Sequence, residues 1–575
     1  MPNYNFKFCS LKNFFYFCPM FVRVKDSPNS PKKAVQIVQS YREGNKVKQR
    51  IVRHVGTALN QDEVNRLQEL AYYIIAQMEH QQQPRLFSPE DMAQMAIEAR
   101  NKPQDEKPLP VDLKQLREKQ RIVLGIHEVY GQIYNELGFG KVLNNYSRKV
   151  AAVKNLFHIV MGRLANPASK MATVNDLEQH FGIKLSLASV YRMMDEIDDK
   201  VIDKIQDKAY KATQGLFSEP IRVAFYDCTT LYFESFIEDE LKQKGYSKDL
   251  KFNQSQVLLA LLVTESGLPL GYQVYEGSKY EGHTLKNAIE RIQHKYNVSD
   301  ITFVADSAMF NKDNLNLLNQ LDKKYIVGAR LKNMSQNIQK QILDKEGYTI
   351  LKHDQDNEIF YKELIVNGQR LIITYNLKNA IKDSHDRKEY IEKLMQKLKG
   401  GTVKATDLIK NFGYKKFIRI EGENSISLDE EKIAQEELWD GIRGIMTNDM
   451  QLSVGQLIEQ YHGLWQVEES FRISKHDLKV RPVYHWTPQR IKAHIAICFM
   501  AFTCARHLSY RLRIQKELNM SIEKIRQTLV NIQLSILKDL KTGKHYGLPS
   551  AISQEAKKIY HAVGIKLSDV PFEIT

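Results

Sequence analysis

The change in apolar spacing at Pro220 constrains the fold of this 575-residue chain more than any other feature. From about residue 113 to 214 the apolar side chains recur at helical spacing. Beyond Pro220 the pattern predicts strand 221–233, hairpin 256–277, helix 283–297, strand 301–306, helix 312–321 and strand 324–329. Three meandering strands followed by crossover units predict a mixed sheet with helices packed on it. The sequence therefore predicts a multidomain α/β fold.

Two aspartates lie within or at the end of these strands. Asp227 shares one strand face with Val223 and Phe225, where an unpaired carboxylate would cost several kcal/mol. It must therefore be hydrogen-bonded, paired or bound to a metal. Asp306 ends the apolar strand 301–306, and open sheets usually place their chemistry at the C-terminal ends of strands. Each residue has an ordinary alternative, since Asp227 can cap a bend and Asp306 can cap the next helix.

A third carboxylate lies on a helix in the last quarter of the chain. The stretch "YHGLWQVEESFRISKHDLKVRP" (461–482) has helical spacing, and one stripe of it is formed by Tyr461, Leu464, Glu468, Arg472 and Lys475. Such a stripe is normally apolar, but this one carries a carboxylate and two cations. If the stripe packs over the sheet, Glu468 meets Asp227 and Asp306.

Three carboxylates in one pocket repel one another unless divalent cations neutralise them. Oxygen ligands without a nearby cysteine or histidine cluster favour magnesium or manganese over zinc. Two such ions about 3.5 to 4 Å apart activate an attacking oxygen and stabilise a leaving one in phosphodiester exchange. The three acidic residues are therefore a candidate site for two metal ions.

The charge balance indicates the kind of partner. The chain has 83 Lys and Arg against 68 Asp and Glu, a net charge of +15, which suits a partner covered in phosphate. A basic ribosome-associated or membrane-surface protein has a similar balance. Five scattered cysteines without CxxC spacing indicate a reducing cytosol and no structural zinc. The apolar run 491–502 is too short to span a bilayer, so we expect a cytoplasmic protein.

The N-terminal half divides into three expected parts. Residues 1–100 contain a basic β-hairpin, with strands 34–41 and 47–55 around a turn at Gly44, followed by helices. Residues 101–112 are a proline-rich linker. Residues 113–215 are helical, and Tyr191 and Arg192 lie early on a helix that resembles the second half of a helix-turn-helix. Plain packing is the alternative for that helix. Met20 opens a more ordinary sequence than the residues before it, and we expect the true start nearer to it.

The chain resembles the DDE transposases of bacterial insertion sequences. In one subgroup a Tyr-Arg-Glu-Lys signature marks the helix of the catalytic glutamate, and the matching positions here are Tyr461, Leu464, Glu468 and Lys475. The arginine position is leucine, and Arg472 or Arg481 is a candidate to supply the missing charge. The stretches "YDCTTLYFES" around Asp227 and "VADSAMF" around Asp306 also look like this family.

The resemblance implies an RNase H-like core that is interrupted by a β-rich insertion and preceded by a helical DNA-binding region. The implied parts are core residues 216–335, insertion 336–438, the second core part 439–515 with the glutamate helix, and a helical C-terminal tail 516–575. A dimer or larger assembly on paired DNA ends is implied as well.

The resemblance also implies roles for individual residues. Asp227, Asp306 and Glu468 would bind two magnesium or manganese ions, for hydrolysis at the element's end and then attack of the 3′ hydroxyl on target DNA. Tyr461 and Lys475 would contact phosphates.

Trp439 and Trp465 are candidates for stacking an unpaired base, with burial in a core as the alternative. For the whole chain, the alternative functions are an RNase H-like nuclease without strand transfer and a DNA-binding protein with a decayed core.

Overall fold

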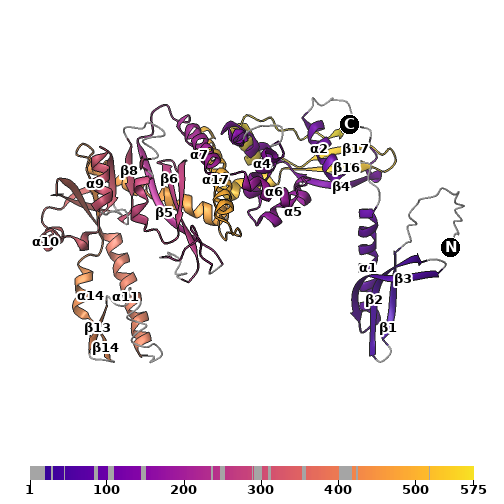
Figure 1. Cartoon of the computed structure of the whole chain (residues 1–575), viewed down its shortest axis with the longest axis horizontal. Coiled ribbons are helices and arrows are strands. Elements are labelled where there is room, and N and C mark those ends of the chain that lie inside the picture. Colours follow the sequence, from indigo (N-terminus) through magenta and orange to yellow (C-terminus); the bar gives the residue numbers. More distant parts are fainter. Residues whose placement is uncertain are drawn as a thin grey trace. The chain divides into compact units, whose positions relative to one another are not determined.

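The computed structural model describes most of the chain. The described residues are 20–27, 30–43, 46–82, 88–101, 109, 111–143, 150–234, 237–245, 253–287, 289–290, 301–307, 312–352, 358–399, 417–421, 425–516 and 518–574. The chain forms two compact units, Met1–Ser88 and Pro89–Thr575 (Figure 1). The expected linker 101–112 and the turn at Gly44 lie largely outside the described residues.

The first unit is a three-stranded antiparallel sheet with one helix on it. Strands β1 (Met20–Ser27), β2 (Ser30–Glu43) and β3 (Lys46–Ala58) lie in that order, and helix α1 (Gln61–Gln82) packs against all three. The core between them contains Val35, Ile37, Ala58, Val64, Ala71 and Ile75. Strands β2 and β3 form the predicted hairpin, and the basic side chains Lys48, Arg50 and Arg53 are exposed on it.

The second unit is built on a nine-stranded mixed sheet, in the order β10-β11-β12-β15-β9-β8-β5-β6-β7. Its core strands are β5 (Val223–Tyr232), β6 (Gln256–Thr264), β7 (Pro269–Glu276), β8 (Thr302–Ala305) and β9 (Lys324–Gly328). The first three form an antiparallel meander, and β8 and β9 run parallel to β5. This order and these directions are those of an RNase H-like core.

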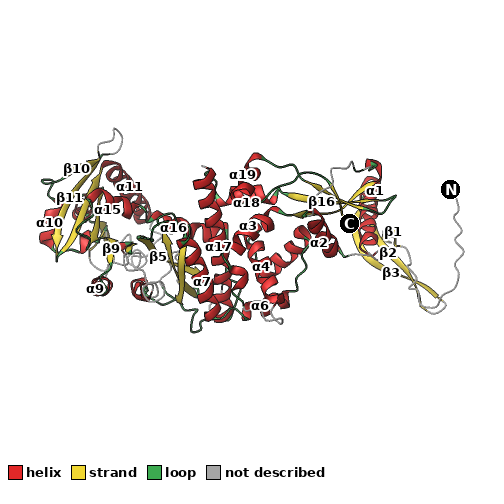
Figure 2. Cartoon of the chain, turned by 90° about the horizontal axis from the view of Figure 1, so that it is seen from above, coloured by secondary structure: helices red, strands yellow, loops and turns green. Residues whose placement is uncertain are grey.

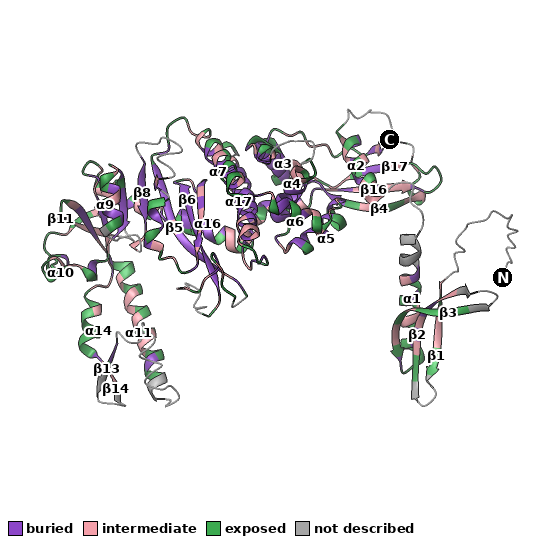
Figure 3. Ribbon diagram, viewed as in Figure 1, coloured by how far each residue is buried: buried purple, intermediate pink, exposed green. Residues whose placement is uncertain are grey.

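The two faces of this sheet enter two different hydrophobic cores. Along β5, Phe225 points into the core shared with helices α15 (Val454–His462), α16 (Trp465–Arg472) and α17 (Pro488–Lys516), whereas Tyr226 points into the other. The second core is covered by α9 (Lys312–Gln320) and α10 (Gln336–Leu343). Strand β6 is buried along its whole length, as Figure 3 shows.

The residues between β9 and α15 extend the central sheet. Strand β15 (Ile442–Thr447) pairs antiparallel with β9, and β12 (Gln369–Asn376), β11 (Ile359–Val366) and β10 (Thr349–Lys352) follow. An edge strand exposes unpaired backbone groups that a further strand satisfies. The same segment contains α11 (Leu377–Lys399), α14 (Glu430–Glu437) and a hairpin of β13 (Ile418–Glu421) and β14 (Ser425–Leu428). The expected insertion 336–438 thus mixes helices and strands, and its main strands belong to the core sheet.

Helices that precede the core sheet in the sequence pack with helices that follow it and form one helical body. They are α3 (Gly125–Glu136), α4 (Val150–Ala165), α5 (Lys170–Phe181), α6 (Leu187–Asp195) and α7 (Asp199–Gln214), together with α17, α18 (Ile522–Val530) and α19 (Gln554–Ala562). Helix α17 packs against α3, α4, α6, α7 and α19, and Figure 2 shows it beside α7. The helical region is therefore joined to the core through α17.

Residues 113–215 and 516–575 were expected to be helical, but both segments also contribute strands to a second sheet, which has four strands. Strand β4 (Leu116–Val123) pairs with β16 (Gln533–Asp539), and β17 (His545–Pro549) and β18 (Phe572–Ile574) follow. Helix α2 (Pro89–Arg100) packs on these strands and so belongs to the second unit. Local spacing does not reveal this sheet, because β4 and β16 are about 400 residues apart in the chain.

Among the described residues, no helix is both long and apolar enough to cross a membrane.

Candidate active site

Asp227 and Asp306 lie on neighbouring parallel strands. The last residue pair between β5 and β8 directly precedes both aspartates. Because side chains alternate between faces, Asp227 leaves the sheet on the side of Phe225 and Asp306 on the side of Val304, and both of these belong to the core under α16. Both aspartates are half-buried. The sheet thus places two carboxylates at the same level and on the same face.

The ordinary alternatives for these aspartates do not hold in the structure. Asp227 lies inside regular β5, paired with Leu261, and its Oδ1 accepts a hydrogen bond from the N–H of Cys228 at 2.7 Å. It therefore caps no bend. Helix α9 begins at Lys312, six residues after Asp306, so Asp306 is not its N-cap. Residues 308–311 between them lie outside the described residues.

Glu468 lies on α16, which packs against β5 and β6 on the face that carries the aspartates. Val467 and Phe471 of this helix enter the same core as Phe225. The chain approaches the sheet closely at Gly463, where a Cβ would lie 2.4 Å from a ring carbon of Phe225. The side chain of Glu468 is exposed. The helix therefore lies on the aspartates' face while its carboxylate stays open to solvent.

The stretch 461–482 is not one helix. Helix α15 ends at His462, α16 begins at Trp465, and residues Ile473–Asp477 form a π-helical turn, a feature that is frequent at functional sites. Leu464 lies at the first break and is only 8% exposed, within the core. The stripe inferred from helical spacing is therefore not one continuous face. Leu464 occupies the position where the signature has arginine, and its side chain packs among apolar residues.

The side chain of Tyr461 reaches the end of strand β9, next to Ser307. Burial and the negative charges of Asp306 and Glu468 raise the pKa of Tyr461 to about 12. Its hydroxyl lies beside the end of β9, since a Cβ added to Gly328 would lie 2.5 Å from it and 3.0 Å from the backbone nitrogen of Ser307. The phenol therefore lies beside the chain that follows Asp306.

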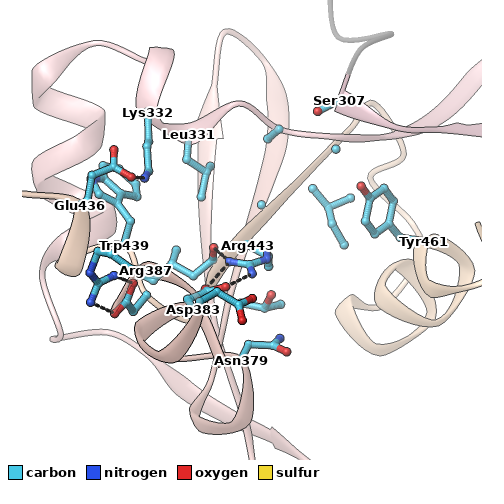
Figure 4. Close-up of a pocket in the computed structure, with 18 of the residues that line it drawn as sticks. Ser307, Leu331, Lys332, Asn379, Asp383, Arg387, Glu436, Trp439, Arg443 and Tyr461 are labelled. Atoms are coloured by element: carbon cyan, nitrogen blue, oxygen red, sulfur yellow. Dashed lines mark hydrogen bonds and ion pairs between the residues drawn. The ribbon is translucent and has the colours of Figure 1, made fainter. Parts of the chain in front are cut away.

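A cavity of about 820 Å³ opens beside Tyr461. Ser307 and Tyr461 lie at one end of it, and Trp439 lies at the other (Figure 4). Ion pairs that join the insertion to the neighbouring core segments line its wall: Arg387 with Asp440 at 2.8 Å, Arg443 with Asp383 at 2.8 Å, and Lys332 with Glu436 at 2.8 Å. The Nζ of Lys332 lies 5.9 Å from the centre of the Trp439 ring. These wall residues carry no sequence signal, because only the extended sheet brings the insertion next to Tyr461.

The remaining candidates from the glutamate stretch have different surroundings. Arg472 forms two hydrogen bonds of 2.7 Å with Glu469, so its charge is already paired within the helix. Lys475 is half-buried in the π-helical turn. The guanidinium of Arg481 lies 5.1 Å from the centre of the Tyr232 ring, at the end of the strand that carries Asp227. Trp465 is 55% exposed, which contradicts burial in a core.

The helix-turn-helix candidate forms as the sequence predicts locally. Helix α6 begins after Ser186, whose hydroxyl accepts a hydrogen bond from the N–H of Ser189. Tyr191 is half-buried, and the guanidinium of Arg490 lies 5.0 Å from its ring centre. Arg192 is exposed. Packing thus accounts for Tyr191, whereas Arg192 can reach a partner.

The three acidic residues offer the type of donor atom that a hard divalent cation takes, but the structure does not gather them into one group. Within the part of the chain that the structure describes, no three carboxylate, imidazole or thiol side chains are grouped closely enough to hold a metal ion. Magnesium usually keeps several waters and takes one or two protein carboxylates, with substrate phosphates completing its shell. Asp227, Asp306 and Glu468 offer oxygen donors only, and Glu468 is open to solvent. They fit an ion that is shared with a bound phosphate.

Comparisons with known proteins give two matches to protein families. Residues 218–504 match the family described as "Transposase DDE domain", and residues 22–84 match the "IS1634 family transposase, N-terminal domain". No curated protein matches the chain.

Two solved structures are similar at low identity. A piggyBac transposase synaptic complex with hairpin DNA has a TM-score of 0.38 and 10% identity, over 71% of this chain and 76% of that chain. A Mos1 transposase paired-end complex with the left transposon end has a TM-score of 0.14 and 12% identity, over 28% of this chain and 53% of that chain.

The strand order of the core sheet and the helices on it define an RNase H-like catalytic fold. The chain belongs to the DDE transposases of insertion sequences. The larger match runs from β5 through the insertion and α16 into α17, and the smaller one covers most of the first unit. The Tyr-Arg-Glu-Lys subgroup stays a prediction.

Proposed function

We propose that this transposase cuts the ends of its insertion sequence and joins the new 3′ hydroxyls to target DNA. One observation carries the proposal. Asp227 and Asp306 leave the same face of adjacent strands, and α16 with Glu468 packs on that face.

Asp227, Asp306 and Glu468 are the residues that would hold two magnesium or manganese ions. When bound, the ions would activate the attacking oxygen and stabilise the leaving one. The rigid strands fix the two aspartates, and the packing of α16 fixes the glutamate. Because even an unperturbed tyrosine has a pKa near 10, Tyr461 keeps its proton at neutral pH and would donate a hydrogen bond to a phosphate oxygen. Trp439 and Trp465 would stack an unpaired base, each worth about 1 to 3 kcal/mol.

Lys475→Ala is expected to weaken binding of the element's end and to reduce the slope of log K against log salt by about one unit. The proposed reason is the loss of one phosphate contact from the turn that follows Glu468. Fluorescence anisotropy of a labelled end at several salt concentrations measures the slope. Lys558→Ala, an exposed lysine on α19, is the control. An unchanged slope for Lys475→Ala rules out the phosphate contact.

Pre-cleaved ends with free 3′ hydroxyls are expected to be joined to a plasmid by the full-length protein in magnesium. This experiment separates transposase from simple nuclease, because strand transfer needs a hydroxyl as the attacking group, whereas a nuclease uses only water. Gel electrophoresis of the plasmid measures joining. Two ends joined to one plasmid indicate that a dimer or larger assembly holds a pair of ends. Nicked plasmid without joined ends favours the nuclease, and binding without cleavage or joining favours the decayed DNA-binding protein.

A further inference from the structure

The π-helical turn that follows the helix of Glu468 ends in a series of carbonyl groups that no continuing helix can satisfy. The last four carbonyls of a helix have no partner within it. Here the chain turns away through Lys479, whose φ of 45° lies in the left-handed region. The N–H groups of Leu478 and Val480 return to the carbonyls of Ile473 and Ser474. The carbonyls of residues 477 to 480 therefore need partners from elsewhere.

Side chains from three helices supply these partners. We name these side chains the carbonyl anchor (Arg163, His494 and Arg526). Arg526 of α18 donates to the carbonyl of Asp477 at 3.0 Å. Arg163 of α4 donates to the carbonyls of Leu478 and Lys479 at 3.3 and 3.2 Å.

His494 of α17 completes the anchor. Its Nε2 lies 3.0 Å from the carbonyl of Val480, and it must be the donor because a carbonyl only accepts. Its Nδ1 then accepts from Lys170 at 3.1 Å. Four consecutive carbonyls are thus bound by basic side chains.

The burial of Arg163 makes these bonds more than surface contacts. Its side chain is only 3% exposed, and a buried guanidinium requires acceptors for its donors. The acceptors that the structure shows for it are the carbonyls at the end of the glutamate segment. Positive charge is also favourable at a helix C-terminus. Arg163 therefore holds the chain at the end of the π-helical turn.

The other end of α16 is held in a similar way. Arg506 of α17 donates to Gln466 Oε1 at 3.3 Å, and to the carbonyls of Ser266 and Gly267 at 2.8 Å each. The turn at Gly267 has a φ of 71°, and a Cβ there would lie 1.7 Å from the guanidinium. Glycine at this position lets Arg506 join the hairpin β6–β7 to the first turn of the glutamate helix.

We propose that Arg163 and Arg506 are positioning residues for the helix of Glu468, with Arg506 at its first turn and Arg163 at the end of the π-helical turn that follows it. The role in catalysis rests on the proposed function, whereas the fixing of the helix does not. Because α4 and α17 belong to the helical body, this body determines the position of Glu468 relative to the two aspartates.

Trp465, three residues before Glu468, can report the motion of this helix without DNA or metal. The chain has three tryptophans, so Trp439→Phe with Trp486→Phe leaves Trp465 as the only one. In this background Arg163→Met is expected to increase the amplitude of nanosecond motion in the fluorescence anisotropy decay on the order of twofold. Gln466→Met, which removes the acceptor that α16 offers to Arg506 with little change in size, is expected to act in the same direction.

Arg370→Met is the matched control. Arg370 is also buried and donates to two backbone carbonyls, those of Asp449 and Leu452, but not to the glutamate helix. Its substitution is expected to leave the decay of Trp465 unchanged. Circular dichroism confirms that each variant is folded. If Arg163→Met does not fold, Arg163→Lys, with one donor group in place of a planar fork, replaces it. An unchanged decay in the folded Arg163 variant and in Gln466→Met overturns the proposal.

The role of Arg163 in catalysis is tested in protein that keeps all three tryptophans. Arg163→Met is expected to slow single-turnover cleavage at saturating end DNA on the order of tenfold, with Kd for the end unchanged and partial recovery in Arg163→Lys. An equal loss in Arg370→Met, or a loss that lies wholly in Kd, contradicts a positioning role. If the wild type neither cleaves nor joins ends, the proposed function fails, while the decay of Trp465 still decides whether the helix is fixed.

Discussion

Replacing Glu468 by glutamine is expected to lower the rate of end cleavage by on the order of a thousandfold or more. The amide keeps the size of the side chain but loses the negative charge that a divalent cation requires. Asp227→Asn and Asp306→Asn are expected to give losses of the same order, because all three carboxylates would act on the same ions. Single-turnover cleavage of a labelled end in magnesium measures the rate, and a gel-shift experiment measures end binding, which should stay nearly unchanged.

Glu469 provides a control on the same helix. It is half-buried and paired with Arg472 rather than directed at the aspartates. Because a partly exposed ion pair contributes only about 0 to 1 kcal/mol, Glu469→Gln is expected to have a small effect on cleavage. Comparable losses in the two variants would show that the helix tolerates no amide here. Near-normal cleavage by Glu468→Gln would remove Glu468 from the site.

Leu464→Arg, which restores the signature residue, is expected to destabilise the protein by about 3 kcal/mol or more rather than to increase its activity. Leu464 is 8% exposed and lies in the core between α16 and the sheet. A guanidinium there would lose its hydration among the apolar neighbours. The midpoint of urea unfolding, followed by circular dichroism, measures the loss.

Leu464→Met separates the effect of charge from that of shape. Because methionine nearly conserves the volume of leucine, this change is expected to cost less than about 1.5 kcal/mol. If Leu464→Arg instead keeps its stability and binds the DNA end more tightly, its side chain reaches the phosphates. The position would then belong to the DNA interface, as the signature implies.

The core of the fold could be predicted from local pattern. The predicted strands 221–233 and 301–306 correspond to β5 and β8, and the predicted helix 312–321 corresponds to α9. Two observations explain this success. Strands that are buried on both faces form short apolar runs, and parallel neighbours require a crossover. The face of Asp227 followed from the alternation of side chains along a strand.

Other features did not follow from local pattern. The spacing of 461–482 predicts one helix, but Gly463 brings the chain against Phe225, and a π-helical turn follows Arg472. Close packing against the sheet overrides helical spacing at these points. Strand β4 similarly depends on β16 near the other end of the chain. A strand of this kind is stabilised by a distant partner, which its own sequence does not identify.

The sequence by itself indicated the three acidic candidates, the order of the core strands along the chain and the basic excess that suits DNA, because each of these is written in residue type or in short-range spacing. Only the tertiary structure decided that Asp227 and Asp306 share the face covered by α16, that the insertion extends the core sheet, and that Arg163 and Arg506 bind the two ends of the Glu468 segment. These features depend on hydrogen bonds between residues as many as 316 positions apart. Such contacts leave no trace in local periodicity, since backbone carbonyls are the same at every residue.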